Sequence, residues 1–135
     1  MDTIELYSMN DIIEIIKAKL TPSLLPLWMH DRNVANPMYG HCYHSSAVLK
    51  HYYPNLQLNK GLDWEGEWHW WCVDEMGMII DITAEQYTSI GKELPYEVGV
   101  KANELWLGSY KDRVRRLIKA VDNHNNNKWF SYEKE

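Results

Sequence analysis

The chain is organised around the stretch Tyr39-Gly40-His41-Cys42-Tyr43-His44-Ser45-Ser46-Ala47-Val48-Leu49. Gly40 can turn the chain, and the residues after it predict a helix of about 12 residues that ends before Pro54. Cys42 then lies in the first helical turn, where unpaired N–H groups and the helix dipole favour a thiolate. The dipole contributes only about 0.3–1 kcal/mol, or up to ~2 when buried, so a reactive thiolate also needs a histidine partner.

A second stretch, residues 67–83, predicts a β-hairpin. Glu75-Met76-Gly77 fits a three-residue loop with glycine in the left-handed position. With that loop, His69 and Asp81 lie on the same face of the sheet, one step apart on the diagonal. A two-residue loop would put Asp81 on the opposite face.

Cys42, His69 and Asp81, in this chain order, predict a nucleophile, its base and the group that orients the base. His41 and His44 are near Cys42 in sequence but badly aimed, since adjacent helical residues point about 100° apart and those two apart roughly 200°. We therefore expect His69 to be the base. The alternatives are a buried inert thiol at Cys42 and a solvated hairpin carboxylate at Asp81.

A zinc site is the main chemical alternative. The candidate ligands are His41, Cys42 and His44, with His51 or His69. Their spacing is not that of a recognised zinc finger, and strand alternation points Cys72 to the face opposite His69. We therefore expect no metal and no cofactor.

Composition limits the function classes. The net charge of −5 argues against a nucleic-acid surface, which needs a clustered basic face. No stretch reaches the roughly 18 apolar residues of a membrane span, and the N-terminal residues lack the pattern of a signal peptide. We expect a cytoplasmic protein with two free thiols, and no partnership with nucleic acid or membrane. Seven Trp and nine Tyr against one Phe indicate half-buried clefts or interfaces.

The rest of the chain predicts one domain over residues 1–135, with a core over about 10–122 and a frayed tail at 123–135. Asn10 or Asp11 can cap a first helix. Thr83-Ala84-Glu85-Gln86 has the capping-box pattern and predicts a short helical turn.

Two surface features are expected beside these elements. The stretch Trp64-Glu65-Gly66-Glu67-Trp68 can form one wall of an aromatic groove. Arg113, Arg115 and Arg116 are expected on the solvated face of a last helix that opens at Ser109, and an anion site is the alternative reading.

These motifs resemble the transglutaminase-like branch of the papain-like cysteine hydrolases. The matching residues are Cys42, His69 with Trp71, and Asp81 with Thr83. Ile82 stands where that family usually has proline.

A longer string, over residues 36–118, resembles a family of uncharacterised phage and bacterial proteins. It comprises Asn36-Pro37, Gly40-His41-Cys42, His69-Trp70-Trp71, Asp81-Ile82-Thr83, Gln86-Tyr87, Tyr96-Glu97-x-Gly99 and the Ser109–Leu117 segment. If the chain is phage-encoded, its compartment is the host cytoplasm.

The resemblance implies an α+β fold with a papain-like or transglutaminase-like core, in which helices pack on a small antiparallel sheet. It implies cysteine-dependent acyl transfer on an amide or ester of a peptide or protein, by hydrolysis, deamidation or transglutamination. It also implies an oxyanion hole made by the Cys42 N–H and one upstream side chain. Asn36 occupies the position where papain-like enzymes have glutamine, and a plain turn residue before Pro37 is the alternative reading.

Trp68, Trp71 and Gln86 are further candidates for contact with the substrate or the oxyanion. The alternative function is a catalytically silent module, of a kind found in phage, that binds and blocks a host protein through its aromatic surface.

Overall fold

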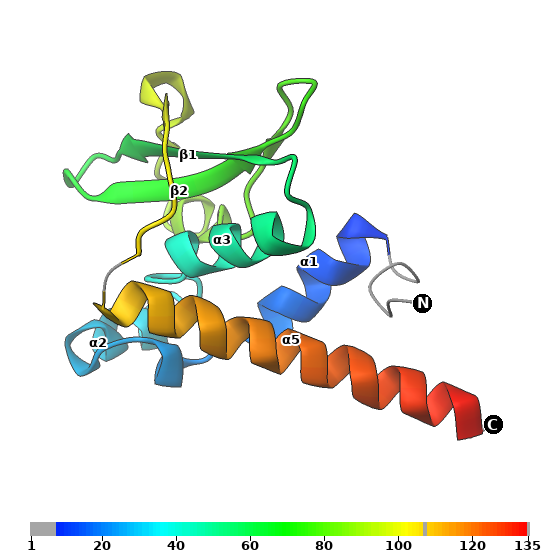
Figure 1. Cartoon of the computed structure of the whole chain (residues 1–135). Coiled ribbons are helices and arrows are strands. Elements are labelled where there is room, and N and C mark those ends of the chain that lie inside the picture. The colour runs from blue at the N-terminus through cyan, green and yellow to red at the C-terminus, as the bar shows by residue number, and fades with distance from the viewer. Residues whose placement is uncertain (1–7, 107, 135) are drawn as a thin grey trace.

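The computed structural model describes the backbone of residues 8–106 and 108–134, and the side chains up to residue 124 except that of residue 107. Its fold is α+β: five α-helices pack on a four-stranded antiparallel sheet of order β3-β2-β1-β4 (Figure 1). The elements are α1 Met9–Ala18, η2 Pro22–Leu24, η3 Leu27–Met29, α2 His30–Ala35, α3 Cys42–Tyr52, β1 Gln57–Leu62, β2 Trp68–Val73, β3 Ile79–Ile80, α4 Glu85–Thr88, η4 Tyr96–Val98, β4 Val100–Lys101 and α5 Gly108–Lys134.

The hairpin between β2 and β3 has the predicted three-residue loop. The Asp74 N–H donates to the Met78 carbonyl over 3.0 Å, and Gly77 has φ of 83°. Cys72 therefore pairs with Ile80 across the two strands. Because β3 is only two residues long, the His69 end of β2 has no strand beside it on that side among the described residues.

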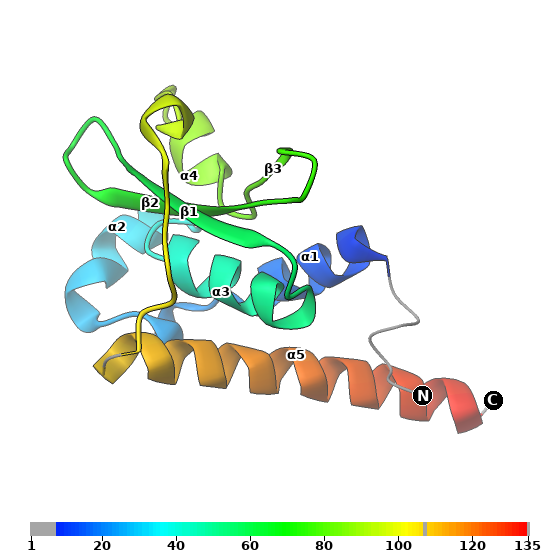
Figure 2. The ribbon, with the colours of Figure 1, turned by 45° about the horizontal axis from the view of Figure 1, so that its top comes forward.

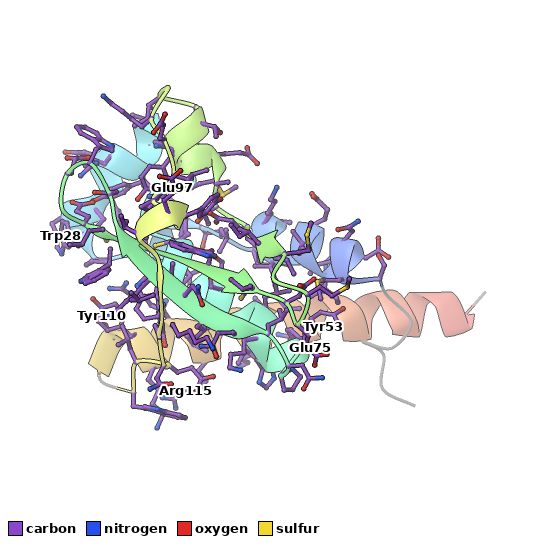
Figure 3. The ribbon with its side chains drawn as sticks, turned by 90° about the horizontal axis from the view of Figure 1, so that it is seen from above. Trp28, Tyr53, Glu75, Glu97, Tyr110 and Arg115 are labelled. Atoms are coloured by element: carbon purple, nitrogen blue, oxygen red, sulfur yellow. The ribbon has the colours of Figure 1, made fainter. Side chains whose placement is uncertain are left out.

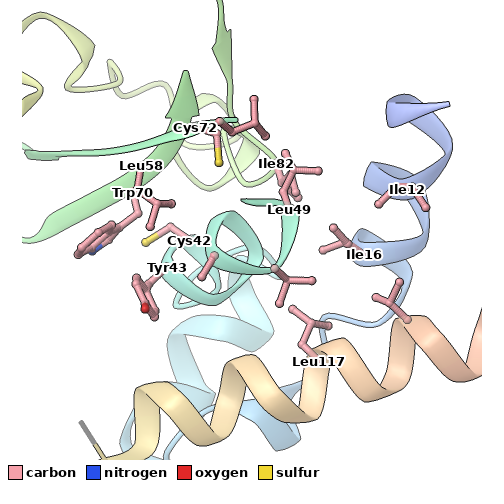
Figure 4. Packing of buried hydrophobic residues seen from close by; sticks show 14 of the residues in the cluster. Ile12, Ile16, Cys42, Tyr43, Leu49, Leu58, Trp70, Cys72, Ile82 and Leu117 are labelled. Carbon is pink, nitrogen blue, oxygen red and sulfur yellow. The ribbon is translucent and has the colours of Figure 1, made fainter. Parts of the chain in front are cut away.

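The two faces of β2 carry different residues, as the alternation predicts. Trp70 and Cys72 point into the hydrophobic core together with Leu58 of β1 (Figure 4). His69 and Trp71 point to the opposite face, which α4 covers (Figure 2). The imidazole of His69 and the hydrophobic core therefore lie on opposite sides of one strand.

Helix α3 is the centre of the packing. It lies between the sheet and α5, and every residue from Cys42 to Leu49 is buried (Figures 1 and 2). Ile12 and Ile16 of α1 and Leu117 of α5 close the core around it. The predicted helix start at Cys42 is confirmed, and the helix ends at Tyr52, before Pro54.

Two predicted helix caps are wrong. Ser8, rather than Asn10 or Asp11, caps α1: its hydroxyl accepts the Asp11 N–H, and the Asp11 carboxylate accepts the Ser8 N–H in return. Thr83 does not cap α4, since its hydroxyl is buried without a partner and the helix begins at Glu85. Thr83 is fully buried, so contacts with neighbouring segments determine its position and its side chain does not cap α4.

The last helix is longer than the sequence indicated. α5 continues to Lys134, past the predicted limit near Asp122. The Asn-rich segment has low helix propensity but contains no glycine or proline, so an established helix can propagate through it. Within the described residues, no helix is both long enough and apolar enough to cross a membrane.

Gly99 tests how tightly the covered sheet face is packed. It follows η4 with an ordinary φ of −68°, but a Cβ there would lie 2.8 Å from Cη2 of Trp71. We expect Gly99→Ala to lower the free energy of unfolding by about 1–3 kcal/mol through overpacking. Denaturant titration measures it. The exposed neighbour Val98, changed to alanine, is the control, and equal effects of the two substitutions would contradict this packing.

Candidate active site

His69 and Asp81 form the centre of the site. Nε2 of His69 lies 2.6 Å from Oδ2 of Asp81, and both side chains are buried. The Tyr96 hydroxyl donates to the same carboxylate over 2.8 Å, and the Thr83 N–H donates to its other oxygen over 3.1 Å. The diagonal pairing predicted from the hairpin register is confirmed, and the carboxylate is held by three groups.

Cys42 is the first residue of α3 and reaches the open edge of β2, where its Sγ lies 3.8 Å from the Trp68 carbonyl oxygen. Nδ1 of His69, the nitrogen not bonded to Asp81, is buried without a hydrogen-bond partner. Cys42 is near enough to this imidazole for the two groups to interact electrostatically. The structure thus brings together the three residues that the sequence singled out.

The imidazole of His69 is held in its charged form. Burial acts to lower its pKa, but the hydrogen bonds and charges of Asp81 and Cys42 outweigh burial and raise the pKa from 6.5 to about 9. At neutral pH the ring is therefore an imidazolium between a carboxylate and a sulfur atom. This cation is the partner that a thiolate at Cys42 requires.

Aromatic rings fix the orientation of the imidazole. Trp71 stacks on His69 with ring centroids 5.8 Å apart, and Tyr87 meets it edge-on at 4.6 Å. The Tyr87 hydroxyl is itself anchored to Asp63 over 2.7 Å. Trp71 is 1% exposed and packs beneath the histidine, so its predicted role in contacting substrate would have to act through His69.

A groove of about 420 Å³ opens beside the thiol. Its walls include Cys42, Trp28, Trp68, Trp70, Gln86 and Tyr87. Trp68 is 47% exposed and stands at the rim with Lys60 over its ring at 4.4 Å. The predicted aromatic wall is therefore present at Gly66–Trp68, whereas Trp64 lies outside the groove lining and stacks with Lys92.

The two amide side chains proposed for the oxyanion differ in position. Nδ2 of Asn36 donates to the Gln86 backbone carbonyl over 2.7 Å, which ties the segment before α3 to α4. The Gln86 side chain lines the groove with Cys42, and its Oε1 is buried without a partner. Gln86 is therefore the better placed of the two, because the amide of Asn36 is already engaged.

The histidines next to Cys42 pair with each other. Nδ1 of His41 and Nε2 of His44 lie 2.7 Å apart in a fully buried pair. Burial, reinforced by Arg113, lowers the pKa of His41 to about 4, and burial holds that of His44 well below 6.5. Both imidazoles are therefore neutral at pH 7, and neither supplies the imidazolium that a thiolate at Cys42 requires. The described residues contain no group of three or more His, Cys, Asp or Glu side chains that could hold a metal ion.

Cys72 lies on the core face of β2, as the alternation predicted. Its Sγ donates to the Ser46 carbonyl over 3.3 Å, and burial raises its pKa to about 12. Cys42 and Cys72 are both free thiols. Their settings differ, because Cys72 is sealed in an apolar core and Cys42 borders a groove.

Arg113 corrects the expectation of a solvated arginine face on the last helix. It is only 9% exposed and lines the groove with Cys42, whereas Arg115 and Arg116 are exposed. The signal was available in the sequence: Arg113 precedes Leu117 by four residues, and Leu117 precedes Val121 by four, so all three share one helix face. Tyr96 and Tyr87 were also missed as supports of the site, since they come from loop and short-helix segments without periodicity.

Comparisons of the chain with models of protein families, with curated proteins and with solved structures found no match.

Proposed function

We propose that the protein catalyses cysteine-dependent acyl transfer on an amide or ester group of a peptide or protein. One observation carries the proposal: a buried His69 that bonds Asp81 over 2.6 Å and interacts with the Cys42 thiol at the edge of an open groove. Nucleophile, base and orienter each come from a different element, α3, β2 and the segment after β3. A base that is bonded to its orienter and has its second nitrogen free beside a thiol is the arrangement from which a nucleophile can be activated.

The first half of the reaction uses the ion pair directly. The Cys42 thiolate attacks the acyl carbon, forming a C–S bond and moving the carbonyl electron pair onto oxygen. When the tetrahedral intermediate collapses, the bond to the leaving amine or alcohol breaks, and the His69 imidazolium supplies the proton that this group needs.

The second half reverses the proton flow. His69, now neutral, takes a proton from the incoming nucleophile as this attacks the thioester, and the C–S bond breaks to release Cys42. Water as the nucleophile gives hydrolysis or, on a primary amide, deamidation, whereas an amine gives transglutamination. The same three residues serve all of these reactions.

The developing oxyanion needs donors near Cys42. The backbone N–H groups of the first helical turn have no partner within the helix, so the N–H of Cys42 is available. Gln86 is proposed as the second donor, since its side chain lines the same groove. Asn36 acts one step back by holding the Gln86 carbonyl.

The exposed aromatic surface favours a second candidate, a silent module that binds a host protein. Trp28, Trp64 and Trp106 are 72%, 56% and 69% exposed, and Leu27 and Val34 add apolar area beside α2. Exposed large apolar side chains of this kind mark interaction surfaces. The two candidates differ in one measurable respect, the reactivity of Cys42.

We expect iodoacetamide at neutral pH to alkylate Cys42 selectively. Cys42→Ser should abolish the labelling, whereas Cys72→Ser should leave its rate within a few-fold, since burial already raises the pKa of Cys72 to about 12. Mass spectrometry of the labelled peptide measures both. An unreactive Cys42 in the folded wild type would favour the binding module.

Asp81→Asn tests whether Asp81 supports the reactivity of Cys42 or only the fold. Loss of the carboxylate removes the main group that raises the pKa of His69, so the imidazolium that would activate Cys42 is lost at lower pH. We expect the rate of Cys42 alkylation at pH 7 to fall roughly 10- to 1,000-fold, less than the ~10⁴ in turnover of a serine triad. Asp74→Asn, at the other end of the same hairpin, is the control and should leave that rate unchanged.

The stability of Asp81→Asn should depend on pH in a defined direction. The folded pKa of His69, about 9, lies above the 6.5 of the unfolded chain, so its ionic contacts stabilise the fold fully below pH 6.5. That contribution disappears as the pH rises through about 9. Asp81→Asn should therefore cost roughly 1–3 kcal/mol near pH 6 and progressively less toward pH 10. A pH-independent loss would leave Asp81 as an ordinary structural carboxylate.

Gln86 can be tested by comparing two reactions of the same thiol. Alkylation develops no oxyanion, whereas hydrolysis of p-nitrophenyl acetate does. We expect Gln86→Ala to lower the esterase rate about 10²- to 10³-fold and to leave alkylation nearly unchanged. Asn36→Ala is the comparison, and a larger esterase loss there than in Gln86→Ala would make Asn36 the donor.

A further inference from the structure

Arg113 is a buried cation without a buried anion. Its side chain is 9% exposed, and the bond it makes to a side chain is a long one, 3.4 Å to the Ser109 hydroxyl. Its guanidinium lies 5.1 Å from the centroid of the Tyr110 ring. Within the part of the chain whose side chains are described, no carboxylate pairs with it.

Such an arrangement is costly, because a charge removed from water needs a partner of opposite sign. Other arginines of this chain have such partners. Arg32 pairs with Glu65 over 2.8 Å and with Glu67 over 3.4 Å, and Arg116 pairs with Asp112 over 2.9 Å. Arg115 also lacks a carboxylate partner among the described residues, but it is exposed to water, whereas Arg113 is both unpaired and buried.

Arg113 lines the same groove as Cys42. Its charge is felt next to the thiol, since it lowers the pKa of His41, the residue directly before Cys42. Figure 3 shows Tyr110, over which Arg113 lies, at the same end of the molecule as Trp28, another residue of the groove. The guanidinium and the thiol therefore border one space.

The groove as a whole is short of negative charge. Lys60 also lines it and lies 4.4 Å and 5.4 Å from the ring centroids of Trp68 and Trp70, again without a carboxylate among the described residues. Glu67 is the acid found in the described lining, and Arg32 already pairs with it. A protein of net charge −5 thus presents a locally positive groove at its thiol.

We propose that the acyl substrate carries a carboxylate, which Arg113 binds while Cys42 attacks the acyl carbon. A guanidinium binds a carboxylate through two parallel N–H···O bonds, which fixes orientation as well as position. The tryptophans and tyrosines of the groove hold the apolar part between the two charged ends. The carboxylate comes from an acidic side chain of a peptide or from its C-terminus. This inference rests on the proposed acyl transfer at Cys42.

Two alkylating reagents that differ in charge test the proposal. Iodoacetate and iodoacetamide both form a bond from Sγ of Cys42 to carbon and release iodide, but only iodoacetate carries a carboxylate. The measured quantity is the ratio of the second-order rate constants, iodoacetate over iodoacetamide. We expect Arg113→Gln to lower this ratio about 5-fold or more, because the attraction between the guanidinium and the reagent's carboxylate is lost.

Matched variants separate a local effect from a change in net charge. Arg115→Gln removes the same charge from an exposed position of α5 and should leave the ratio within about 2-fold. Arg113→Lys keeps the charge and should recover most of the ratio. Thermal melting checks that each variant is folded. An unchanged ratio in folded Arg113→Gln overturns the assignment of Arg113 and leaves the thiol chemistry standing.

A binding titration tests whether Arg113 binds a carboxylate, independently of any reaction of the Cys42 thiol. The probes are N-acetyl-glutamate methylamide, with a side-chain carboxylate, N-acetyl-glutamine, with a terminal carboxylate, and neutral N-acetyl-glutamine methylamide. Tryptophan fluorescence is the readout, since Trp28, Trp68 and Trp70 line the groove. Tighter binding of one charged probe than of the neutral one, lost in Arg113→Gln, supports the proposal and identifies the source of the carboxylate. No preference for charge in the wild type overturns it.

If Cys42 is unreactive toward both reagents, the acyl-transfer proposal fails, and the titration alone decides whether Arg113 binds carboxylates.

Discussion

The register of the β2–β3 hairpin is the constraint on which the site depends. A three-residue loop places Asp81 on the face of His69, where they meet at 2.6 Å, and a slip of one residue would send the carboxylate to the core face. The short β3 then leaves the edge of β2 open at its His69 end, and Cys42 reaches that edge from α3. The relative placement of Cys42, His69 and Asp81 therefore depends on loop length and strand length together.

The residues around His69 and Asp81 hold these two side chains in place. Trp71 and Tyr87 restrict the imidazole from two sides, and Tyr96 holds the carboxylate that orients it. Gly99 leaves room for the Trp71 ring that stacks on His69. The cost of burying an ionised carboxylate is offset by the three hydrogen bonds it accepts, and they also hold His69 in its charged form.

The parts of the fold that local signals determine could be predicted from the sequence. Gly40 and Pro54 bracket a helix, and Gly77 marks the turn of the hairpin, so the relative positions of His69 and Asp81 followed from counting residues. The parts that depend on packing between distant segments could not. Strand alternation puts Trp71 and Trp68 on different faces of β2, but nothing local shows that Trp71 is sealed beneath His69 while Trp68 stands at the groove.

The position of the Arg113 charge likewise depends on packing between distant segments. The helical spacing with Leu117 and Val121 can place Arg113 on the buried face of α5, but only the contact of α5 with α3 puts it against the groove. The Asn-rich end of α5 is helical although its residues have low helix propensity, because a helix already formed upstream propagates through them.

The buried pair of His41 and His44 has a consequence for the acid side of the stability curve. Both pKa values lie below the 6.5 of the unfolded chain, that of His41 at about 4, so the unfolded state binds more protons as the pH falls from 6.5 toward 4. The free energy of unfolding therefore decreases as the pH falls. The pKa of His69 is shifted in the opposite direction, so the stabilisation that His69 contributes is lost as the pH rises toward 9. Together these three histidines contribute most to the stability of the fold near pH 6.5, because the neutral pair loses its contribution below that pH and the imidazolium above it.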